Sequence, residues 1–444
     1  MSTPGSNTPG SSGELPSPRD AVAVVAAPER HWFQEPTQPV SKKYIATLVG
    51  AQLVFYIALL GPAIIGIGVK VQSIVPDDQK TSALGLVAGF GAACAVIGNV
   101  MFGRLSDRTT SRWGRRRPWI VGGTIVMTIA FLIMALSTTV PVLTVGWCLA
   151  QLGANAALGP WLASVSDQVP TFQRASVTAL LGVVQNVAIL GGSFVANIFA
   201  DQMVIMFVGP AILAAVAAVV FAAILPDQQM KVRPPALSAG EWIVTFWVNP
   251  RKHPDFAFAW LSRFLMTLGG FMFTTFRLFF LQDELGVAEA DAPAAVSFGV
   301  LVFTIASVVC ASVAGRISDR TGRRKFLVIG SSLLSGIGIF ALAHVTGVEG
   351  FYVVEAILGA ASGIYMGVDL ALVMDVLPNP DDAGKDLGVF NMANALPQTV
   401  APMIGAALLA VASASSQNYD LLMYGCAAAS ALGALAIVPI KKVK

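Results

Sequence analysis

The 444-residue sequence has few charged residues, three histidines and four cysteines, and these shortages exclude several classes of protein. Charged residues make up 12% of the chain, whereas soluble domains carry roughly a quarter. No His or Cys cluster has metal-ligand spacing, and no Walker A, HExxH or nucleophile-and-base set is present. We therefore expect no cofactor, no metal, no ATP-driven step and no enzyme activity.

The sequence instead contains long apolar runs, and 55% of its residues are hydrophobic. Each run can cross a hydrocarbon core of about 30 Å, which needs roughly 20 helical residues. In lipid, a helix forms all of its backbone hydrogen bonds within its own segment, whereas strands would have to close into a barrel. We predict an all-α multi-pass membrane protein with twelve transmembrane helices in two pseudo-symmetric six-helix bundles. The runs lie near residues 44–69, 81–102, 118–138, 141–165, 175–200, 203–225, 256–281, 293–314, 326–345, 351–374, 386–412 and 419–440.

The positions of the 28 Lys and Arg residues predict the orientation. Lys70 and Lys80 are the only two that fall in the loops on one side of the membrane, and Arg263 and Arg277 are the only two inside a predicted span. The others fall in the tails and in the loops on the opposite side. Because positive loops stay in the cytoplasm, we expect both termini to be cytoplasmic. We also expect the protein to lie in the plasma membrane and to be a monomer.

The predicted spans divide the chain into a Ser- and Pro-rich tail, two bundles and a linker. In the linker, Ser238 and Glu241 have capping-box spacing, which predicts a short helix lying on the membrane surface. The segments are a disordered tail (1–43), a first bundle (44–225), a linker (226–255), a second bundle (256–440) and a tail (441–444).

A basic motif occurs twice, each time between two apolar runs: GRLSDRTTSRWGRRRP at 103–118 and GRISDRTGRRK at 315–325. Between two spans, such a cluster indicates a cytoplasmic hairpin rather than a nucleic-acid site. After a four-residue insertion the copies lie 208 residues apart, as Gly114 and Gly322 do. The opening glycines are expected to let helices approach closely, although arginines that only set topology are an alternative. The predicted gate residues are Gly103, Asp107, Arg108, Gly114, Arg115, Arg116, Gly315, Asp319, Arg320, Gly322, Arg323 and Arg324.

Both copies resemble the cytoplasmic signature of the major facilitator superfamily. The run SDRTTSRWGRRRPWI is more particularly similar to sucrose transporters and their glycoside-pentoside-hexuronide relatives. The resemblance implies alternating access, with Asp107 pairing near the start of helix 11 and Asp319 near the start of helix 5 when the cytoplasmic side closes. In QLGANAALGP, Asn155 matches that group, whereas Gln151 takes the place of its acidic residue.

Ionisable residues inside predicted spans are costly and therefore mark functional sites. Their depths along the helices predict two ion pairs, Asp369 with Arg263 and Glu355 with Arg277. One carboxylate could exchange its arginine for a proton during transport, or both pairs could be fixed and structural.

Neutral amide side chains share helix faces and suit a hydroxyl-rich solute. Hydrogen bonding between helices is the competing explanation. The candidate substrate-binding residues are Gln151, Asn155, Gln185, Asn186, Asn391, Asn394 and Gln398.

These observations favour a secondary active transporter of a small polar solute, of the sugar or glycoside class, with a proton or another cation as coupling ion. The alternative is a proton-coupled exporter of drugs or metabolites, although the fifth span lacks the Gly-Pro pair of such exporters. Facilitated diffusion and a non-transporting sensor remain further alternatives.

Overall fold

The structure is a computed structural model that describes residues 36–227, 229, 248–378, 383–411 and 417–441. Within these ranges it is helical and contains no strand. Twelve helical segments are long and apolar enough to cross a membrane, which confirms the expected fold class. The predicted surface helix of the linker falls on residues 230–247, outside the described ranges, as do residues 1–35 and 442–444 of the tails.

The helices follow the predicted runs closely. Those of the first half are α1 (Lys42–Gly61), π-helical η1 (Pro62–Gly66), α2 (Ile67–Gln72), 3₁₀-helical η2 (Asp77–Gln79), α3 (Lys80–Asp107), α4 (Arg117–Leu136), α5 (Val140–Gln168), α6 (Thr171–Ile198) and α7 (Met203–Ile224). Those of the second half are α9 (Pro254–Asp283), α10 (Ala292–Thr321), α11 (Arg324–Leu342), α12 (Val348–Val376), α13 (Ala383–Leu409) and α14 (Tyr419–Ile437).

The first span is interrupted by the π-helical turn η1. Pro62 has no backbone N–H to donate, so the α-helical hydrogen-bond pattern cannot continue through it. The turn begins where Gly61 packs on Gly192 of α6, and a Cβ on Gly61 would lie 2.8 Å from the Gly192 carbonyl oxygen. The first span therefore bends where it lies closest to α6.

Small residues bring α10 and α12 into close contact. Gly359, Gly363 and Gly367 recur every four residues on one face of α12. A Cβ on Gly363 would lie 2.1 Å from the carbonyl oxygen of Ser307 on α10, so only glycine fits there. Such packing holds helices together in lipid, where burial of apolar side chains gives little advantage.

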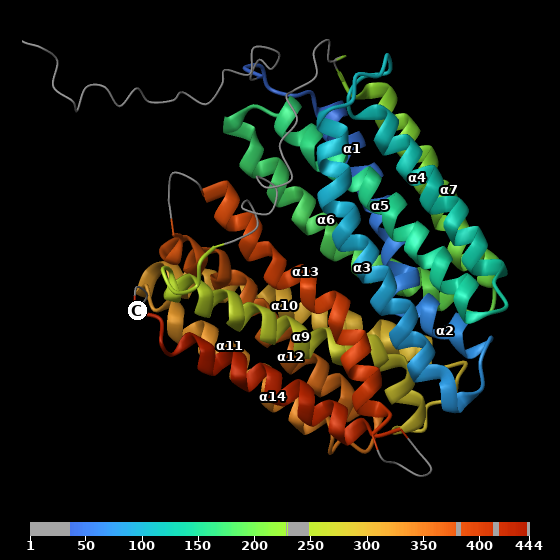
Figure 1. Cartoon of the computed structure of the whole chain (residues 1–444), viewed down its shortest axis with the longest axis vertical. Coiled ribbons are helices and arrows are strands. Elements are labelled where there is room, and N and C mark those ends of the chain that lie inside the picture. The colour runs from blue at the N-terminus through green and yellow to red at the C-terminus, as the bar shows by residue number, and fades with distance from the viewer. Residues whose placement is uncertain (1–35, 228, 230–247, 379–382, 412–416, 442–444) are drawn as a thin grey trace, which may run out of the picture.

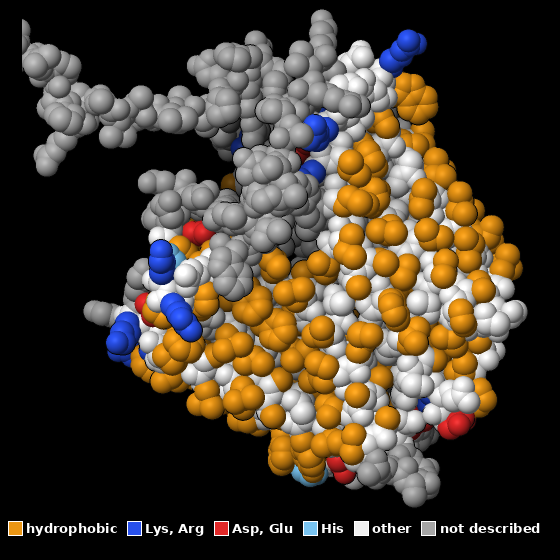
Figure 2. All heavy atoms as spheres, in the orientation of Figure 1, with side chains coloured by type: hydrophobic (Ala, Val, Ile, Leu, Met, Phe, Trp, Pro, Cys, Tyr) orange, Lys and Arg blue, Asp and Glu red, His pale blue; other side chains and the backbone are white. Residues whose placement is uncertain are grey.

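The helices form two groups, α1–α7 and α9–α14, which converge toward the bottom right of Figure 1 and diverge toward its upper left. The end with the two basic hairpins, 103–118 and 315–325, is called the hairpin end here. The opposite end, which carries Lys80 and the loop 284–291, is called the far end. Apolar side chains cover the middle of the face in Figure 2, and charged side chains gather toward its two ends.

Candidate functional site

The first basic hairpin is held by three aspartates, two through ion pairs and one through backbone hydrogen bonds. The Arg116 guanidinium lies 2.7 Å from Asp107 and 2.9 Å from Asp167, at the end of α5, and Arg115 lies 2.6 Å from Asp167. The side chains of Arg115 and Arg116 are nearly buried. Asp227 accepts hydrogen bonds from the backbone N–H groups of Arg116 and Arg117 at the start of α4, a contact that the sequence did not reveal.

The second hairpin repeats one of these ion pairs. Arg324 lies 2.5 Å from Asp375 at the end of α12, and both residues stand 208 positions after Arg116 and Asp167. Asp319, in contrast, is exposed and has no partner among the described residues. Only the first hairpin therefore combines both aspartates in one network.

The other predicted gate residues differ in burial. Arg320 and Arg323 are exposed and Arg108 is half-buried. Among the described residues, no ion pair joins Asp107 to α13 or Asp319 to α6. The pairings that the family resemblance implied for a closed cytoplasmic side are therefore not formed in this arrangement.

Two glycines shape the hairpins through backbone conformation. Gly114 has φ of 103° and Gly322 has φ of 65°, both in the region that favours glycine. The expectation for the opening glycines is wrong: a Cβ on Gly103 would meet no atom within 4 Å, and one on Gly315 would make only an ordinary 3.7 Å contact. Helix approach therefore does not require glycine at either opening position.

Both ion pairs predicted inside the second half are present. Asp369 of α12 lies 2.8 Å from Arg263 of α9, with side chains 10% and 22% exposed. The Arg263 guanidinium also lies over the Phe390 ring, 4.9 Å from its centre. Glu355 and Arg277 are 3.0 Å apart and only 2% and 7% exposed.

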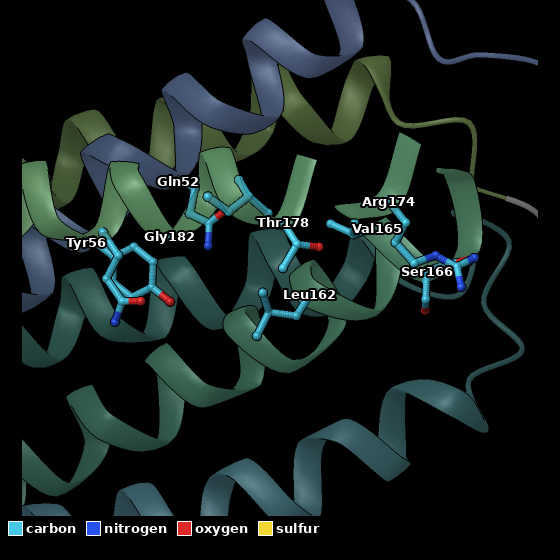
Figure 3. Close-up of a pocket in the computed structure, with 10 residues that line it drawn as sticks. Gln52, Tyr56, Leu162, Val165, Ser166, Arg174, Thr178 and Gly182 are labelled. Carbon is cyan, nitrogen blue, oxygen red and sulfur yellow. The ribbon is translucent and has the colours of Figure 1, made fainter. Parts of the chain in front are cut away.

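A pocket of about 400 Å³ lies in the first half, between α1, α5 and α6 (Figure 3). Tyr56 lies at one end of it in the view, and Ser166 and Arg174 lie at the other. Gln52 lines the pocket, is 2% exposed, and its Oε1 accepts no hydrogen bond. An amide oxygen buried without a donor is costly, and because this oxygen is itself buried, a bound molecule would reach it only after the Gln52 side chain turns into the pocket.

The pocket contains only one of the seven predicted substrate residues, Gln185. Sequence reasoning missed Gln52, Tyr56 and Thr178, which supply an amide and two hydroxyl groups. The shared polar faces of α1 and α6 were the signal that could have found them. Among the described residues, no acidic side chain lines this pocket.

The other predicted amides lie elsewhere. Asn155 accepts a hydrogen bond of 3.4 Å from Asn99 of α3, which is the bonding between helices that the alternative predicts, and it donates one of 2.9 Å to the Gln151 carbonyl oxygen within α5. Gln398 donates to the Asn394 carbonyl oxygen within α13. Two more, Asn186 and Asn391, are exposed.

The two halves are joined at the far end. Among the described residues, the side-chain hydrogen bonds and ion pairs between the halves are Gln72–Gln282, Lys80–Asp283, Thr81–Gln417 and Ser297–Ser193. All four lie near the far-end termini of their helices. The structure is therefore closed at the far end.

Lys80 is the charged centre of this closure. It reaches from α3 to Asp283 of α9 at 2.7 Å, lies over the Phe279 ring and is only 6% exposed on its side chain. Tyr419 donates a hydrogen bond of 2.7 Å to the same carboxylate. The carboxyl of Glu284, just beyond the end of α9, has a pKa raised above its usual 4.5 by burial and by nearby Asp420 and Asp283.

Comparison with known proteins identifies related chains. The sequence pattern of the Major Facilitator Superfamily matches residues 71–309 and 259–444. The MFS-type transporter TOXA of Cochliobolus carbonum is 27% identical over 128 residues, which are 28% of this chain and 22% of that relative. The match thus spans about a fifth of the relative's length.

Several solved structures share the fold. The nucleoside transporter NupG superposes with a TM-score of 0.70 at 14% identity, over 90% of this chain and 100% of its own. An inward-facing, unoccupied bacterial homologue of the human lysosomal transporter Spinster gives 0.65 at 12% identity, over 90% and 96%. An auto-inhibited POT family peptide transporter gives 0.70 at 12%, over 89% and 96%. At these identities the likeness shows the fold alone.

Proposed function

Because this chain belongs to the major facilitator superfamily and is a multi-pass membrane transporter, we propose that it moves a small polar solute of the sugar or glycoside class. In this proposal, the pocket around Gln52 faces the hairpin end in the present arrangement and the far end after a rocking motion of the two halves. The positive charge of the two hairpins supports a cytoplasmic location of the hairpin end and of both termini, and the membrane that we propose is the plasma membrane.

The buried Oε1 of Gln52 carries the proposal. It has no donor among the described residues, so once the side chain turns into the pocket a solute hydroxyl can donate to it without displacing an existing bond. Tyr56 and Thr178 add hydroxyls, Gln185 adds a second amide, and the described lining contains no acid. Such a lining suits a neutral solute with many hydroxyl groups better than a cationic one.

Coupling to a proton or another cation is assigned to the second half. Asp369 is paired with Arg263, and its side chain is 10% exposed against 2% for Glu355, so it is the carboxylate that a proton can reach more readily. Glu355 is almost fully enclosed with Arg277. We assign the coupling role to the first pair and a structural role to the second.

Export of an apolar drug or metabolite is the second candidate. Leu162, Val165 and Leu181 line the same pocket and would accept an apolar ring. A ligand bound mainly by these residues would not need the Gln52 oxygen, so the two candidates differ in their dependence on one atom.

The test is thermal stabilisation of the purified chain by panels of sugars and glycosides, nucleosides, and apolar drugs. Bound ligand raises stability according to its occupancy. The Gln52→Leu variant keeps the side-chain volume but loses the acceptor, and Gln202→Leu, at an exposed glutamine before α7, is the matched control. We expect stabilisation by a sugar or glycoside that is lost in Gln52→Leu and kept in Gln202→Leu. Stabilisation by drugs alone, unaltered in Gln52→Leu, would favour the exporter instead.

A further inference from the structure

A second cavity, of about 480 Å³, lies at the far end where the two halves meet. Asn197 and Phe194 line it from α6, Asp291 and Phe298 from the start of α10, and Tyr352 from α12. It is a broad groove, distinct from the pocket around Gln52 and unrelated to the residues assigned to solute or proton.

The groove changes from polar to apolar along the helix axes. Asn197 and Asp291 lie within two residues of the ends of their membrane-spanning segments, at the level of the lipid headgroups. Phe298 lies six residues after the start of α10 and Tyr352 four after the start of α12, which is roughly 6 to 9 Å into the membrane. A phospholipid has the same order of headgroup followed by acyl chain.

Two features of the groove favour an ammonium group. The Asp291 carboxylate does not cap α10 and has no side-chain partner among the described residues. The Phe298 and Tyr352 rings, with centres 4.7 Å apart, line the deeper, acyl-chain part of the groove. The bordering segments 199–203, 284–291 and 343–350 contain acids but no Lys or Arg.

The neighbouring helix start suits the phosphate of the same headgroup. Val348, the first residue of α12, also lines the groove, and the N-cap Gly347 makes no side-chain bond. Backbone N–H groups at such a helix start favour a phosphate. The groove therefore presents partners for both charges of a zwitterionic headgroup.

We propose that this groove binds a phospholipid with an ammonium headgroup, phosphatidylethanolamine, and that the lipid holds the far end closed. The lining comes from both halves, and the nearby Ser297 hydroxyl already donates to the Ser193 carbonyl oxygen across the same seam, at 2.9 Å. When the far end opens, α6 and α10 must separate, so the binding groove is lost. A ligand that binds only one of two states shifts the balance toward that state.

The experiment measures lipid retention by native mass spectrometry of the full chain from nanodiscs of equal phosphatidylethanolamine and phosphatidylglycerol with matched acyl chains. We expect a roughly two- to fivefold preference for phosphatidylethanolamine, the size that one exposed ion pair with Asp291 supplies. Asp291→Asn should reduce this preference toward one, whereas Tyr352→Leu, in the acyl-chain part, should lower the retention of both lipids and leave the preference unchanged. Asp78→Asn, at an exposed acid of the same end in the other half, is the control and should leave it unchanged.

Several outcomes would overturn the proposal. They are equal retention of both lipids by the unmodified chain, an unchanged preference in Asp291→Asn, or an equal loss in the Asp78→Asn control. Displacement of the lipid by soluble ethanolamine would reassign the groove to a small amine. Retention is measured without solute or gradient, so it does not depend on the transport proposal.

Discussion

Arg324 pairs with Asp375 at 2.5 Å in the same way as Arg116 pairs with Asp167 at 2.9 Å, 208 residues earlier in the chain. In each half, this bond joins the hairpin to the end of a helix, α5 or α12, that carries a proposed functional face. The environments differ, since the Arg116 side chain is 4% exposed and that of Arg324 is 26% exposed. The repeat therefore keeps the bond but not its burial.

The difference in burial predicts unequal effects of removing each arginine. Arg116→Ala leaves Asp167 without one of its two cations, and breaking a buried pair costs about 3–5 kcal/mol. The partly exposed pair of Arg324 with Asp375 contributes about 1 kcal/mol or less. We expect Arg116→Ala to lower the unfolding temperature in detergent more than Arg324→Ala. The unfolding temperature of Arg116→Lys should lie between those of the parent and Arg116→Ala, because lysine keeps the charge but not the several N–H donors of arginine. Equal losses in the two alanine variants would contradict this prediction.

The far-end ion pair predicts a shift between the two arrangements of the transporter. Lys80→Ala removes a nearly buried charge-assisted bond, so the ratio of the far-end-closed to the far-end-open population should fall roughly tenfold or more. The measurement is the spin-label distance between Arg112→Cys and Thr321→Cys, two exposed positions in the hairpins, with the four native cysteines replaced by serine. This distance should shorten as the hairpin end closes.

The neighbouring pair supplies the control for this measurement. Asp77 lies 3.5 Å from Lys80 but its side chain is 82% exposed, so Asp77→Asn should leave the distance distribution unchanged. An unaltered distribution in Lys80→Ala would show that the remaining contacts between the two halves hold the far end closed without this ion pair.

Sequence reasoning succeeded where depth and repetition determine position. Arg263 and Asp369 were paired from their depths along two helices. The pair of Arg324 with Asp375 was not predicted, although the repeat gives it once Arg116 is seen beside Asp167. Helical periodicity gives a face and a depth, but it does not say which neighbour covers that face. For Asn155, both solute binding and bonding between helices were therefore open, and the structure shows a bond to Asn99.

Other misses have the same physical origin. The sequence did not pair Lys80 with Asp283, because the two residues lie 203 positions apart and no repeat links them. Only the distribution of positive charge involved Lys80. Gln52 shares a face of α1 with Tyr56, so periodicity could have given that face, but the missing donor of Gln52 becomes visible only when the surrounding helices are in place. Helical periodicity therefore could not identify this unpaired oxygen, on which the substrate proposal depends.

The raised pKa of Glu284 predicts a pH-dependent stability. Because burial and the charges of Asp420 and Asp283 raise it, the folded protein binds this proton more tightly than the unfolded chain. Its contribution to stability is fully present below the usual pKa of 4.5 and is lost as the pH rises through the raised value. Glu284→Gln should therefore be more stable than the parent chain above this window and lose part of the pH dependence. The free energy of unfolding as a function of pH measures it, with exposed Glu349→Gln as control, and parallel curves for Glu284→Gln and the parent would contradict the assignment.

The two ion pairs of the second half predict different phenotypes for their neutralised carboxylates. Asp369→Asn removes the partly exposed carboxylate to which coupling is assigned, so accumulation driven by an imposed proton gradient in proteoliposomes should fall to the equilibrium ratio. Exchange of labelled for unlabelled solute should persist, because exchange needs the solute pocket but no net proton movement.

Glu355→Gln is the matched control for that prediction. It leaves the buried Arg277 unpaired, with a guanidinium Nε that already lacks a partner among the described residues. We expect a loss of stability of about 3–5 kcal/mol, with gradient-driven accumulation retained by the protein that stays folded. If Asp369→Asn accumulates solute as the parent does while Glu355→Gln does not, the coupling role belongs to Glu355, and exposure to the cavity is not what selects the proton-binding carboxylate.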